Sequence, residues 1–499
     1  MDDLHYDLCV IGGGINGAGI ARDAAGRGLS VLLVEAEDLG GATSSASTKM
    51  IHGGLRYLEH CEFGMVREAL KEREVLLRNA PHLISPIECV FLQDAEQRPQ
   101  WLIRLGLWLY DHLGGKKSLP NSHVVQLADH AFGKPLLDDM LDGIVYSDCY
   151  VDDTRLVVLN AVDAAARNAK VLTHTRCESL KVCDGRWRVT LQDTMSDETL
   201  DVSASMVVNA TGPWVGKFLE GVGIGHRDPD LPMVRLVKGS HIILPRQYEG
   251  DHAYVLQQPD KRIVFVAPYQ GKYTLVGTTE EEFEGNPRDA RISDAEMAYL
   301  CEAVNCAFSK TVLPSDVIFT FSGVRPLLDD GEEDSSEVSR GYRIYHHNRY
   351  DPPFLSVFGG KLTTYRALSE AVVNQLMRLS GRVVEGWSAG EPLTGGDFGG
   401  HSLEAYMQLQ RQQYPWLPME LLQRYIRSYG ARMDYFLHGA ESLADLGMHY
   451  GDQVFKVEVD YLVNYEWAAT AEDVVWRRSK LGLHISDDTV RNIEAALAS

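Results

Sequence analysis

The sequence predicts an α/β protein with a Rossmann-like dinucleotide-binding domain, an inserted antiparallel β-sheet domain and a C-terminal α-helical domain. Three observations lead to this prediction. A βαβ pattern with a glycine fingerprint occupies residues 5–35, short β-rich segments fill 233–279, and a glycine-rich stretch at 388–396 precedes a helical region. The chain has 499 residues, which is too long for one ordinary core, so two or more domains are expected.

The first element is an apolar, buried parallel strand over 6–11, and a glycine turn and a helix follow it. Gly12 and Gly14 allow a tight turn and the close approach of a pyrophosphate, and Gly17 lets the helix pack on the strand. The helix points its amide groups and partial positive charge at the diphosphate. Glu35 closes the second strand, where it can bind both ribose hydroxyls and would repel a 2′-phosphate. The predicted ligand is therefore FAD or NAD rather than NADP.

A long stretch of small residues, 38–58, comes next and is unlike a third Rossmann strand. A flexible linker would not normally contain Met50, Ile51, Leu55 and Arg56 in close order, so we interpret the stretch as a loop that covers the cofactor. A helix is expected over about 62–80.

The middle of the chain should return to the first sheet. A capped helix from Asp152 to Arg167, a hairpin that turns at Asp184-Gly185, and an apolar strand over 202–208 predict this return. The β-rich segments of 233–279, separated by turns, predict the inserted antiparallel sheet. Residues 355–366 again give strand, glycine turn and helix.

Composition excludes several classes of protein. The net charge of −22 argues against non-specific binding of nucleic acid, and it means that an anionic substrate needs a local cationic pocket. Eight cysteines without a CxxC pair and the absence of a signal peptide predict a reduced, cytoplasmic compartment. No apolar run reaches the roughly 20 residues that span a bilayer. We expect no metal site.

Several motifs together resemble the FAD-dependent glycerol-3-phosphate dehydrogenases, within the D-amino-acid-oxidase-like flavoproteins. The most specific are IHGGLRYLEH at 51–60 and VFGGKLTTYR at 357–366. The others are IGGGINGAG at 11–19, SSAS at 44–47, NATGPW at 209–214, KGSH at 238–241, VGTT at 276–279, SGVRP at 322–326 and AEDVVWRRSKLG at 471–482. The resemblance covers essentially the whole chain and is strongest to the bacterial aerobic, quinone-linked members.

The resemblance implies oxidation of sn-glycerol 3-phosphate to dihydroxyacetone phosphate, with electrons passing from the flavin to ubiquinone at the inner face of the cytoplasmic membrane. It also implies an oxidoreductase domain over 1–388 and a helical domain over 389–499. Within the first, the FAD-binding part covers about 1–80, 145–230 and 350–388, and the substrate part about 81–144 and 231–349.

The residues expected to bind FAD come from the motifs that converge on the first sheet. They are Ile11, Gly12, Gly14, Ile15, Asn16, Gly17, Glu35, Ala36, Thr43, Ser44, Ser45, Ser47, Lys49, Gly53, Gly54, Ala210, Thr211, Gly212, Trp214, Gly359, Gly360, Lys361, Leu362 and Thr363.

Substrate-binding residues follow from family position and from the need for cations around a phosphate. Arg56, Tyr57, Arg325 and Lys361 are assigned to the pocket, because guanidinium groups bind phosphate oxygens bidentately. For Arg340 a surface ion pair explains the residue equally well.

The predicted catalytic residues are His52, Arg325 and Lys361. His52 is the natural candidate base, since imidazole titrates near neutral pH. A structural histidine is the alternative, with Arg or Lys lowering the pKa of the alcohol instead. Lys361 and the amide groups beside it should stabilise an anionic reduced flavin.

The segment from Trp101 to Lys117 is apolar and aromatic, and Arg104, Lys116 and Lys117 accompany it. Composition favours a core helix. A surface that lies on a membrane also needs Trp and Tyr beside basic residues, so peripheral contact with membrane lipids is the second interpretation.

Three other functions remain open from the sequence. One is an oxidase that passes electrons to O₂ and makes hydrogen peroxide, and another is a non-catalytic flavin-binding protein. An NAD enzyme is less favoured, because one Rossmann fingerprint accompanies several flavoprotein-type motifs. The residues leave the oligomeric state, including a homodimer, undecided.

Overall fold

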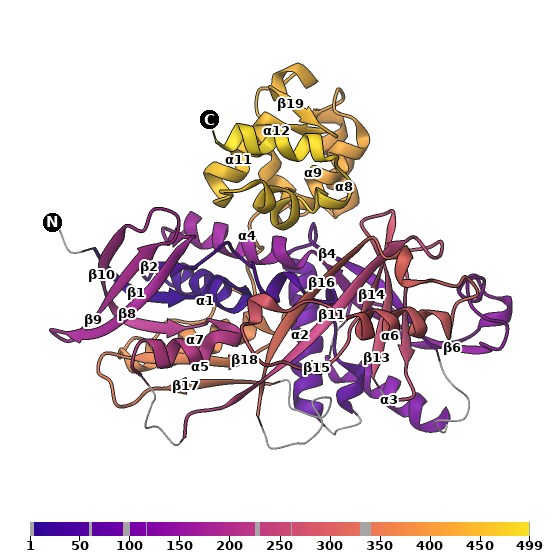
Figure 1. Cartoon of the computed structure of the whole chain (residues 1–499), viewed down its shortest axis with the longest axis horizontal. Helices are drawn as coiled ribbons and strands as arrows, with labels where there is room; N and C mark the ends of the chain where they lie inside the picture. The colour runs from indigo at the N-terminus through magenta and orange to yellow at the C-terminus, as the bar shows by residue number, and fades with distance from the viewer. Residues whose placement is uncertain are drawn as a thin grey trace.

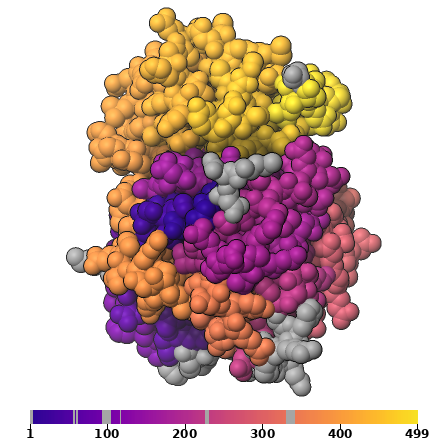
Figure 2. Space-filling model, turned by 90° about the vertical axis from the view of Figure 1, so that its left-hand side faces the viewer, coloured from indigo at the N-terminus to yellow at the C-terminus, as the bar shows by residue number. Residues whose placement is uncertain are grey.

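A computed structural model describes residues 4–58, 62–92, 100–115, 117–224, 230–260, 262–329 and 341–498. It confirms the predicted fold class: two β-sheets lie side by side and a separate helical domain caps them (Figure 1). The C-terminal domain, orange to yellow, sits on the indigo and purple residues of the first domain (Figure 2). None of the helices in the described ranges is long and apolar enough to cross a membrane.

The first sheet is the predicted dinucleotide-binding sheet. Its parallel strands, in spatial order, are β18 (Phe354–Gly359), β10 (Thr199–Asn209), β1 (His5–Ile11), β2 (Val31–Val34) and β7 (Lys170–Leu172). The central strands are apolar runs with both faces covered, as parallel sheets require. The helices α1 (Ile15–Gly26), α4 (Asp153–Ala166) and α7 (Tyr365–Leu379) share the largest buried core with them. The hairpin β8 (Thr175–Cys183) and β9 (Arg186–Asp193) pairs with β10, as predicted.

The second sheet contains the predicted β-rich segments as β11 (Val234–Pro245), β12 (Ala253–Gln257), β13 (Ile263–Tyr269) and β14 (Tyr273–Gly277). Further strands complete it: β3 (Met50–Ile51), β4 (Ile84–Leu92), β5 (His123–Gln126), β6 (Asp142–Val151), β15 (Glu281–Glu282) and β16 (Phe319–Leu328). All its pairs are antiparallel except β12 with β4. The helix α6 (Asp294–Asn305) packs on the sheet and begins with a capping box at Ser293 and Glu296.

Three strands join a different sheet from the one that the predicted division gives them. β3 pairs with β6 in the second sheet, although 1–80 was expected in the FAD-binding part. β6 pairs with β4 in the second sheet, although 145–230 was expected in the FAD-binding part. β17 (Tyr342–His346) forms an antiparallel edge on β18 in the first sheet, although 231–349 was expected in the substrate part. An apolar run marks a strand, but its pairing partner depends on contacts that the run does not encode.

Four main helices build the C-terminal domain around their own aromatic core: α8 (Leu403–Gln413), α9 (Met419–Tyr429), α11 (Lys456–Glu466) and α12 (Asp487–Leu497).

Outside that domain, the helices α2 (Phe63–Asn79) and α3 (Gln100–Leu113) lie beside the second sheet, and α2 matches the helix expected over 62–80 (Figure 1).

Candidate active site

A cavity of about 1460 Å³ is lined by residues of both sheets. Pockets for a single small ligand are usually about 300–1,000 Å³, so this cavity has room for a cofactor and a substrate together. The carboxyl ends of β1 and β10 open into it, which is where ligands bind in sheets of this kind.

The turn between β1 and α1 is built around its glycines. Gly12 has φ +109°, and a Cβ atom there would lie 2.5 Å from the carbonyl oxygen of Ala210. A Cβ atom on Gly17 would lie 1.8 Å from the carbonyl oxygen of Gly12. The turn therefore needs glycine at both positions, and Gly14 caps the helix N-terminus with its amide groups toward the cavity.

Glu35 lines the cavity at the end of β2. Its carboxylate accepts hydrogen bonds from the backbone N–H of Gly13 (2.6 Å) and of Glu37 (2.9 Å). Burial raises the pKa of this carboxyl, and the two amide donors oppose that rise. The side chain is thus fixed against the glycine turn at the position expected to bind the ribose.

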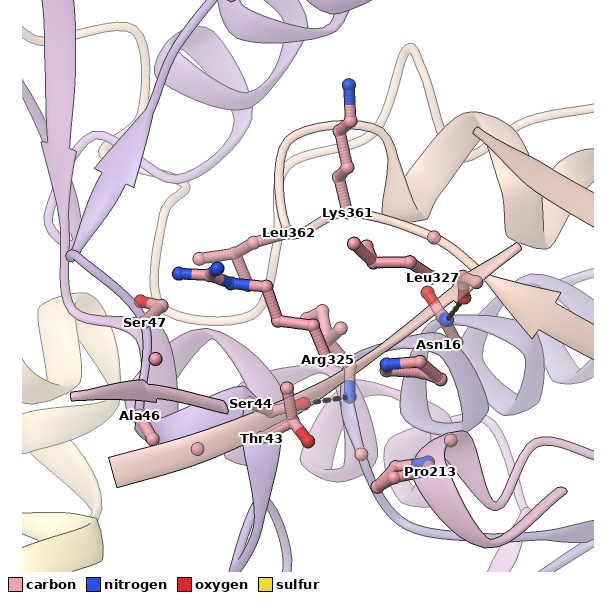
Figure 3. Close-up of a pocket in the computed structure, with 18 of the residues that line it drawn as sticks. Asn16, Thr43, Ser44, Ala46, Ser47, Pro213, Arg325, Leu327, Lys361 and Leu362 are labelled. Atoms are coloured by element: carbon pink, nitrogen blue, oxygen red, sulfur yellow. Dashed lines mark hydrogen bonds between the residues drawn. The ribbon is translucent and has the colours of Figure 1, made fainter. Parts of the chain in front are cut away.

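The loop of 38–49 forms one wall. Thr43 donates to the carbonyl of Val324 in β16 (2.6 Å), and Ser44 accepts from the backbone N–H of Ile15 at the start of α1 (3.0 Å; Figure 3). The loop thereby connects the two sheets across the cavity.

The opposite wall is the glycine turn after β18. Gly359 and Gly360 have φ +75° and +106°, and Asn16 donates from Nδ2 to the carbonyl of Gly359 (3.3 Å). A Cβ atom on Gly360 would lie 2.8 Å from that same Nδ2 atom. The turn therefore packs directly against α1, and both contribute residues to the cavity wall.

Most residues predicted to bind FAD line this cavity. They are Ile11, Gly12, Gly14, Ile15, Asn16, Glu35, Ala36, Thr43, Ser44, Ser47, Gly54, Ala210, Thr211, Gly212, Trp214, Gly359, Gly360, Lys361, Leu362 and Thr363. Gly17, Ser45, Lys49 and Gly53 are not part of the lining that the described residues form. Lys49 is buried elsewhere, in an ion pair with Asp153 (2.6 Å), because a lone buried ammonium group needs a counter-charge.

Arg325 projects from β16 into the cavity, toward Leu362 (Figure 3). Its guanidinium group donates to the hydroxyl of Thr278 (3.1 Å) and lies 3.3 Å from the carboxylate of Glu280. The side chain of Lys361 points away from Arg325, and its Nζ lies 2.6 Å from Sδ of Met65. The two predicted cations thus line the same cavity but diverge.

His52 lines the cavity, and its backbone is fixed by Thr363, whose Oγ1 lies 3.3 Å from the backbone nitrogen and 3.4 Å from the carbonyl oxygen. The next residue is fixed as well, since the N–H of Gly53 donates to the hydroxyl of Tyr110 (2.9 Å). Tyr110 in turn donates to Asp148 (2.7 Å). The His52 segment is therefore held from both sides.

Some predicted substrate-binding residues cannot be placed. Arg340 lies outside the described residues, as do the side chains of Arg56 and Tyr57, whose backbone forms a short 3-10 helix, Leu55–Leu58.

Sequence reasoning missed several acidic residues of the cavity lining, among them Glu280 and Asp148. Glu280 directly follows the VGTT motif, so its proximity to the pocket could have been noticed. Asp148 lies within an apolar strand and carried no comparable signal.

The cavity fits FAD. Asn16 Oδ1 is buried beside the glycine turn and has no hydrogen-bond partner among the residues that the structure describes, as expected of a group that a cofactor would satisfy. Turns at Gly12 and Gly360 leave backbone-lined space, and the N-terminus of α1 faces it. Among the residues that the structure describes, no group of His, Cys, Asp and Glu is arranged to hold a metal ion.

Comparison with known proteins supports FAD as the cofactor. Two family models match the chain: "FAD dependent oxidoreductase" over residues 7–366, and "C-terminal domain of alpha-glycerophosphate oxidase" over residues 388–498. The chain is 48% identical to a glycerol-3-phosphate dehydrogenase of Pseudomonas aeruginosa over 96% of this chain and 93% of that protein. It is 44% identical to the aerobic glycerol-3-phosphate dehydrogenase of Escherichia coli, over 97% and 95%.

Two further relatives are informative. A D-erythritol 1-phosphate dehydrogenase of Brucella abortus is 46% identical, over 96% of this chain and 95% of that protein. The crystal structure of a glycerol-3-phosphate dehydrogenase from Bacillus halodurans, complexed with FAD, superposes with a TM-score of 0.77 at 26% identity, over 99% of this chain and 91% of that one.

Proposed function

The chain belongs to the family of FAD-dependent glycerol-3-phosphate dehydrogenases, and we propose that it oxidises sn-glycerol 3-phosphate to dihydroxyacetone phosphate and passes the electrons to ubiquinone. The observation that carries the choice of substrate is Arg325, a cation on the wall of the cavity that holds the FAD-binding turns. In a chain of net charge −22, such a cation selects for an anionic substrate.

When bound, FAD supplies the acceptor for the hydride that leaves the secondary alcohol carbon. The chain's own residues bind and orient the alcohol. Arg325 binds the phosphate, and the hydrogen bond to Thr278 fixes its guanidinium plane. His52 lines the cavity and takes the proton of the hydroxyl group as general base. Thr363 and Tyr110 fix the backbone of its segment in the cavity wall. A fixed base and a fixed clamp together impose one orientation on a small flexible substrate.

The experiment is anaerobic addition of substrate to the purified yellow protein. Glycerol 3-phosphate should bleach the flavin absorbance, whereas glycerol at the same concentration should not. D-Erythritol 1-phosphate is the necessary comparison, because the Brucella relative is named for that substrate. Faster bleaching by the erythritol ester would reassign the substrate, and no bleaching by either would favour a non-catalytic flavoprotein.

A quinone acceptor is supported by apolar residues in the lining of the same cavity. They include Leu58, Phe63, Phe91, Leu109 and Phe265, which come from the second sheet and from the helices beside it. Apolar lining suits a lipid-soluble acceptor, whereas O₂ does not require it.

The acceptor can be tested at Leu109. Leu109→Asn should depress reduction of a ubiquinone analogue and leave flavin bleaching by substrate intact. Val124→Asn changes an exposed apolar residue outside the lining and serves as the control. Rapid O₂ consumption with stoichiometric peroxide, equal in the wild type and both variants, would instead identify an oxidase.

The proposed site of membrane contact is α3. Its described residues combine both interpretations of this segment: Leu107 and Tyr110 are buried in the core, while Leu105 and Trp108 are 45% and 57% exposed. The exposed pair lies on a helix that contributes Leu105, Leu107 and Leu109 to the cavity lining, so we propose that a quinone enters there from a bilayer surface. A cytoplasmic protein, peripheral on the inner face of the membrane, follows as part of this proposal.

Of the three basic residues of this segment, Arg104, Lys116 and Lys117, the structure describes the side chain of Lys117 alone. Lys117 pairs with Asp111 (2.7 Å), while the side chain of Arg104, and all of Lys116, lie outside the described residues. Liposome sedimentation should show binding that rises with anionic lipid and falls with salt. Replacing all three with Gln should release the protein from vesicles and depress quinone reduction while dye-linked activity persists. Unchanged vesicle binding would leave α3 as a core helix only.

A further inference from the structure

One short segment of the C-terminal domain, residues 473–480, directs three cations at the flavin-binding domain. They are Arg477, Arg478 and Lys480. Their main partners in that domain are two buried carboxylates, Asp38 and Asp153, which lie 115 positions apart in the sequence. Arg477 also pairs with Glu472 and Asp473 of its own domain, and Lys480 lies 3.9 Å from Asp152. Asp38 is the first residue of the loop of 38–49, which forms one wall of the FAD cavity. Asp153 is the first residue of α4 and binds Ser47 and Lys49 at the end of that loop.

Asp38 is the anchor at the start of this loop. Arg478 binds it bidentately, with both N–O distances at 2.7 Å, and Nε of Arg477 lies 2.5 Å from Oδ2. The side chains of Arg478 and Asp38 are 0% and 3% exposed. Removing one partner of such a pair leaves the other charge buried and uncompensated, so the loop start is held strongly.

Asp153 is the anchor at the end of the loop. Its Oδ1 atom accepts from Lys480 (3.0 Å), and its Oδ2 atom accepts from Ser47 (2.7 Å) and Lys49 (2.6 Å). Lys49 also donates to the carbonyl of Ser45 (2.7 Å) and has φ +62°, a backbone conformation that L-residues rarely adopt. Asp153 therefore connects the C-terminal domain to the last turn of the loop.

The two anchors bracket the part of the loop that lines the FAD cavity. The lining residues are all small or polar: Gly40, Gly41, Ala42, Thr43, Ser44, Ala46, Ser47 and Thr48. Glycine and small polar residues have little side-chain packing of their own to define a loop conformation. Their arrangement therefore depends on the ends of the loop and on a few hydrogen bonds to its surroundings. These are the bonds of Thr43 and Ser44, the bond from the N–H of Gly40 to the carbonyl of Gly13 (3.0 Å) and the contact of Thr48 with His241 (3.1 Å).

We propose that residues 473–480 of the C-terminal domain are a positioning element of the FAD site, acting through Asp38 and Asp153 on the loop of 38–49. Neither arginine nor Lys480 lines the FAD cavity that the described residues form. Their effect on the flavin is indirect. The domain thus fixes the conformation of the loop that lines the FAD cavity.

The alternative is that these pairs only hold two domains together. Arg424 offers a matched control, because it binds Glu458 bidentately with a nearly buried carboxylate, yet both residues belong to the C-terminal domain and neither touches the loop. Arg424→Gln should therefore lower the melting temperature without changing the affinity for FAD.

The test uses the full chain after removal of its flavin. Arg478→Gln and Lys480→Gln should each raise the dissociation constant of FAD by about tenfold, measured by quenching of flavin fluorescence. Lys480→Arg, which keeps the charge, should stay near the wild-type value. The proposal is overturned if both Gln variants bind FAD as the wild type does while melting as early as Arg424→Gln.

A measurement on the wild-type holoenzyme covers the case in which a variant does not fold. Amide hydrogen exchange along a denaturant series should show protection lost in 40–48 at the same concentration as in 473–480. Continued protection of 40–48 after 473–480 has opened would overturn the proposal equally.

Discussion

Replacing Arg325 with Ala tests the proposed phosphate site most directly. The change removes a guanidinium group whose nearest described partners are a hydroxyl at 3.1 Å and a carboxylate at 3.3 Å. A charge-assisted hydrogen bond in a shielded site contributes about 2–3 kcal/mol, which corresponds to roughly a hundredfold in kcat/KM. Removing it also leaves the carboxylate of Glu280 facing the dianionic ester, so the loss should reach at least that value.

The assay compares kcat/KM for glycerol 3-phosphate and for glycerol with an artificial dye as acceptor. Arg325→Ala should reduce the first by about a hundredfold and the second by much less, and Lys361→Ala should act in the same direction. Adding Glu280→Gln to Arg325→Ala should recover part of the loss, because it removes the remaining negative charge. Equal losses with both substrates would refute the assignment and place Arg325 in the chemical step or in the fold.

Three further predictions concern the glycine turn at the cofactor, the buried His82, and Glu280 beside Arg325. Gly17→Ala should abolish FAD binding, since its Cβ atom would lie 1.8 Å from a backbone oxygen. The control is Gly64→Ala, whose Cβ atom would meet nothing within 4 Å and which should keep the protein yellow. A yellow Gly17→Ala protein would contradict the turn geometry. Burial and the charges of nearby arginines lower the pKa of His82 to about 3. Between pH 6.5 and pH 5 only the unfolded state therefore gains this proton. The free energy of unfolding should fall by about 2 kcal/mol over that range. His82→Leu should flatten that slope in urea titrations, and an unchanged slope would rule out a neutral buried imidazole. Glu280→Gln alone should lower KM for glycerol 3-phosphate several-fold, since it removes a negative charge 3.3 Å from Arg325, and a higher KM would show that the carboxylate mainly orients the arginine.

The dinucleotide-binding half was predictable because its constraints are local. Gly12 and Gly17 are required by clashes with atoms five residues or fewer away or with the adjacent strand, and such clashes leave a fixed spacing in the sequence. The motif of 357–366 likewise places a strand, a positive-φ turn and a helix in direct succession. Sheet membership was less predictable, because β6 and β17 each select a partner strand by register and packing.

The cations of the site show where sequence reasoning ends. Arg325 lies in the SGVRP motif and Lys49 lies between the SSAS and IHGGLRYLEH motifs, and both were expected at the cavity. The structure places Arg325 at the cavity and Lys49 in a buried cluster, and the difference comes from Asp153 and Lys480, which are remote in the chain. No spacing rule connects residues 49, 153 and 480.

This distribution of charge also explains how a strongly acidic protein can bind an anionic substrate. Positive side chains near the flavin loop are largely matched by buried carboxylates: Arg478 by Asp38, and Lys49 and Lys480 by Asp153. Paired in this way, they fix the loop but add little net positive potential to the cavity. The positive potential that the substrate phosphate meets must then come from cations on the cavity wall, and the proposed ones are Arg325 and Lys361. The carboxylate of Glu280 lies 3.3 Å from Arg325 and lowers that positive potential. We therefore expect the proposed phosphate site at Arg325 to bind a dianionic substrate and still release a dianionic product.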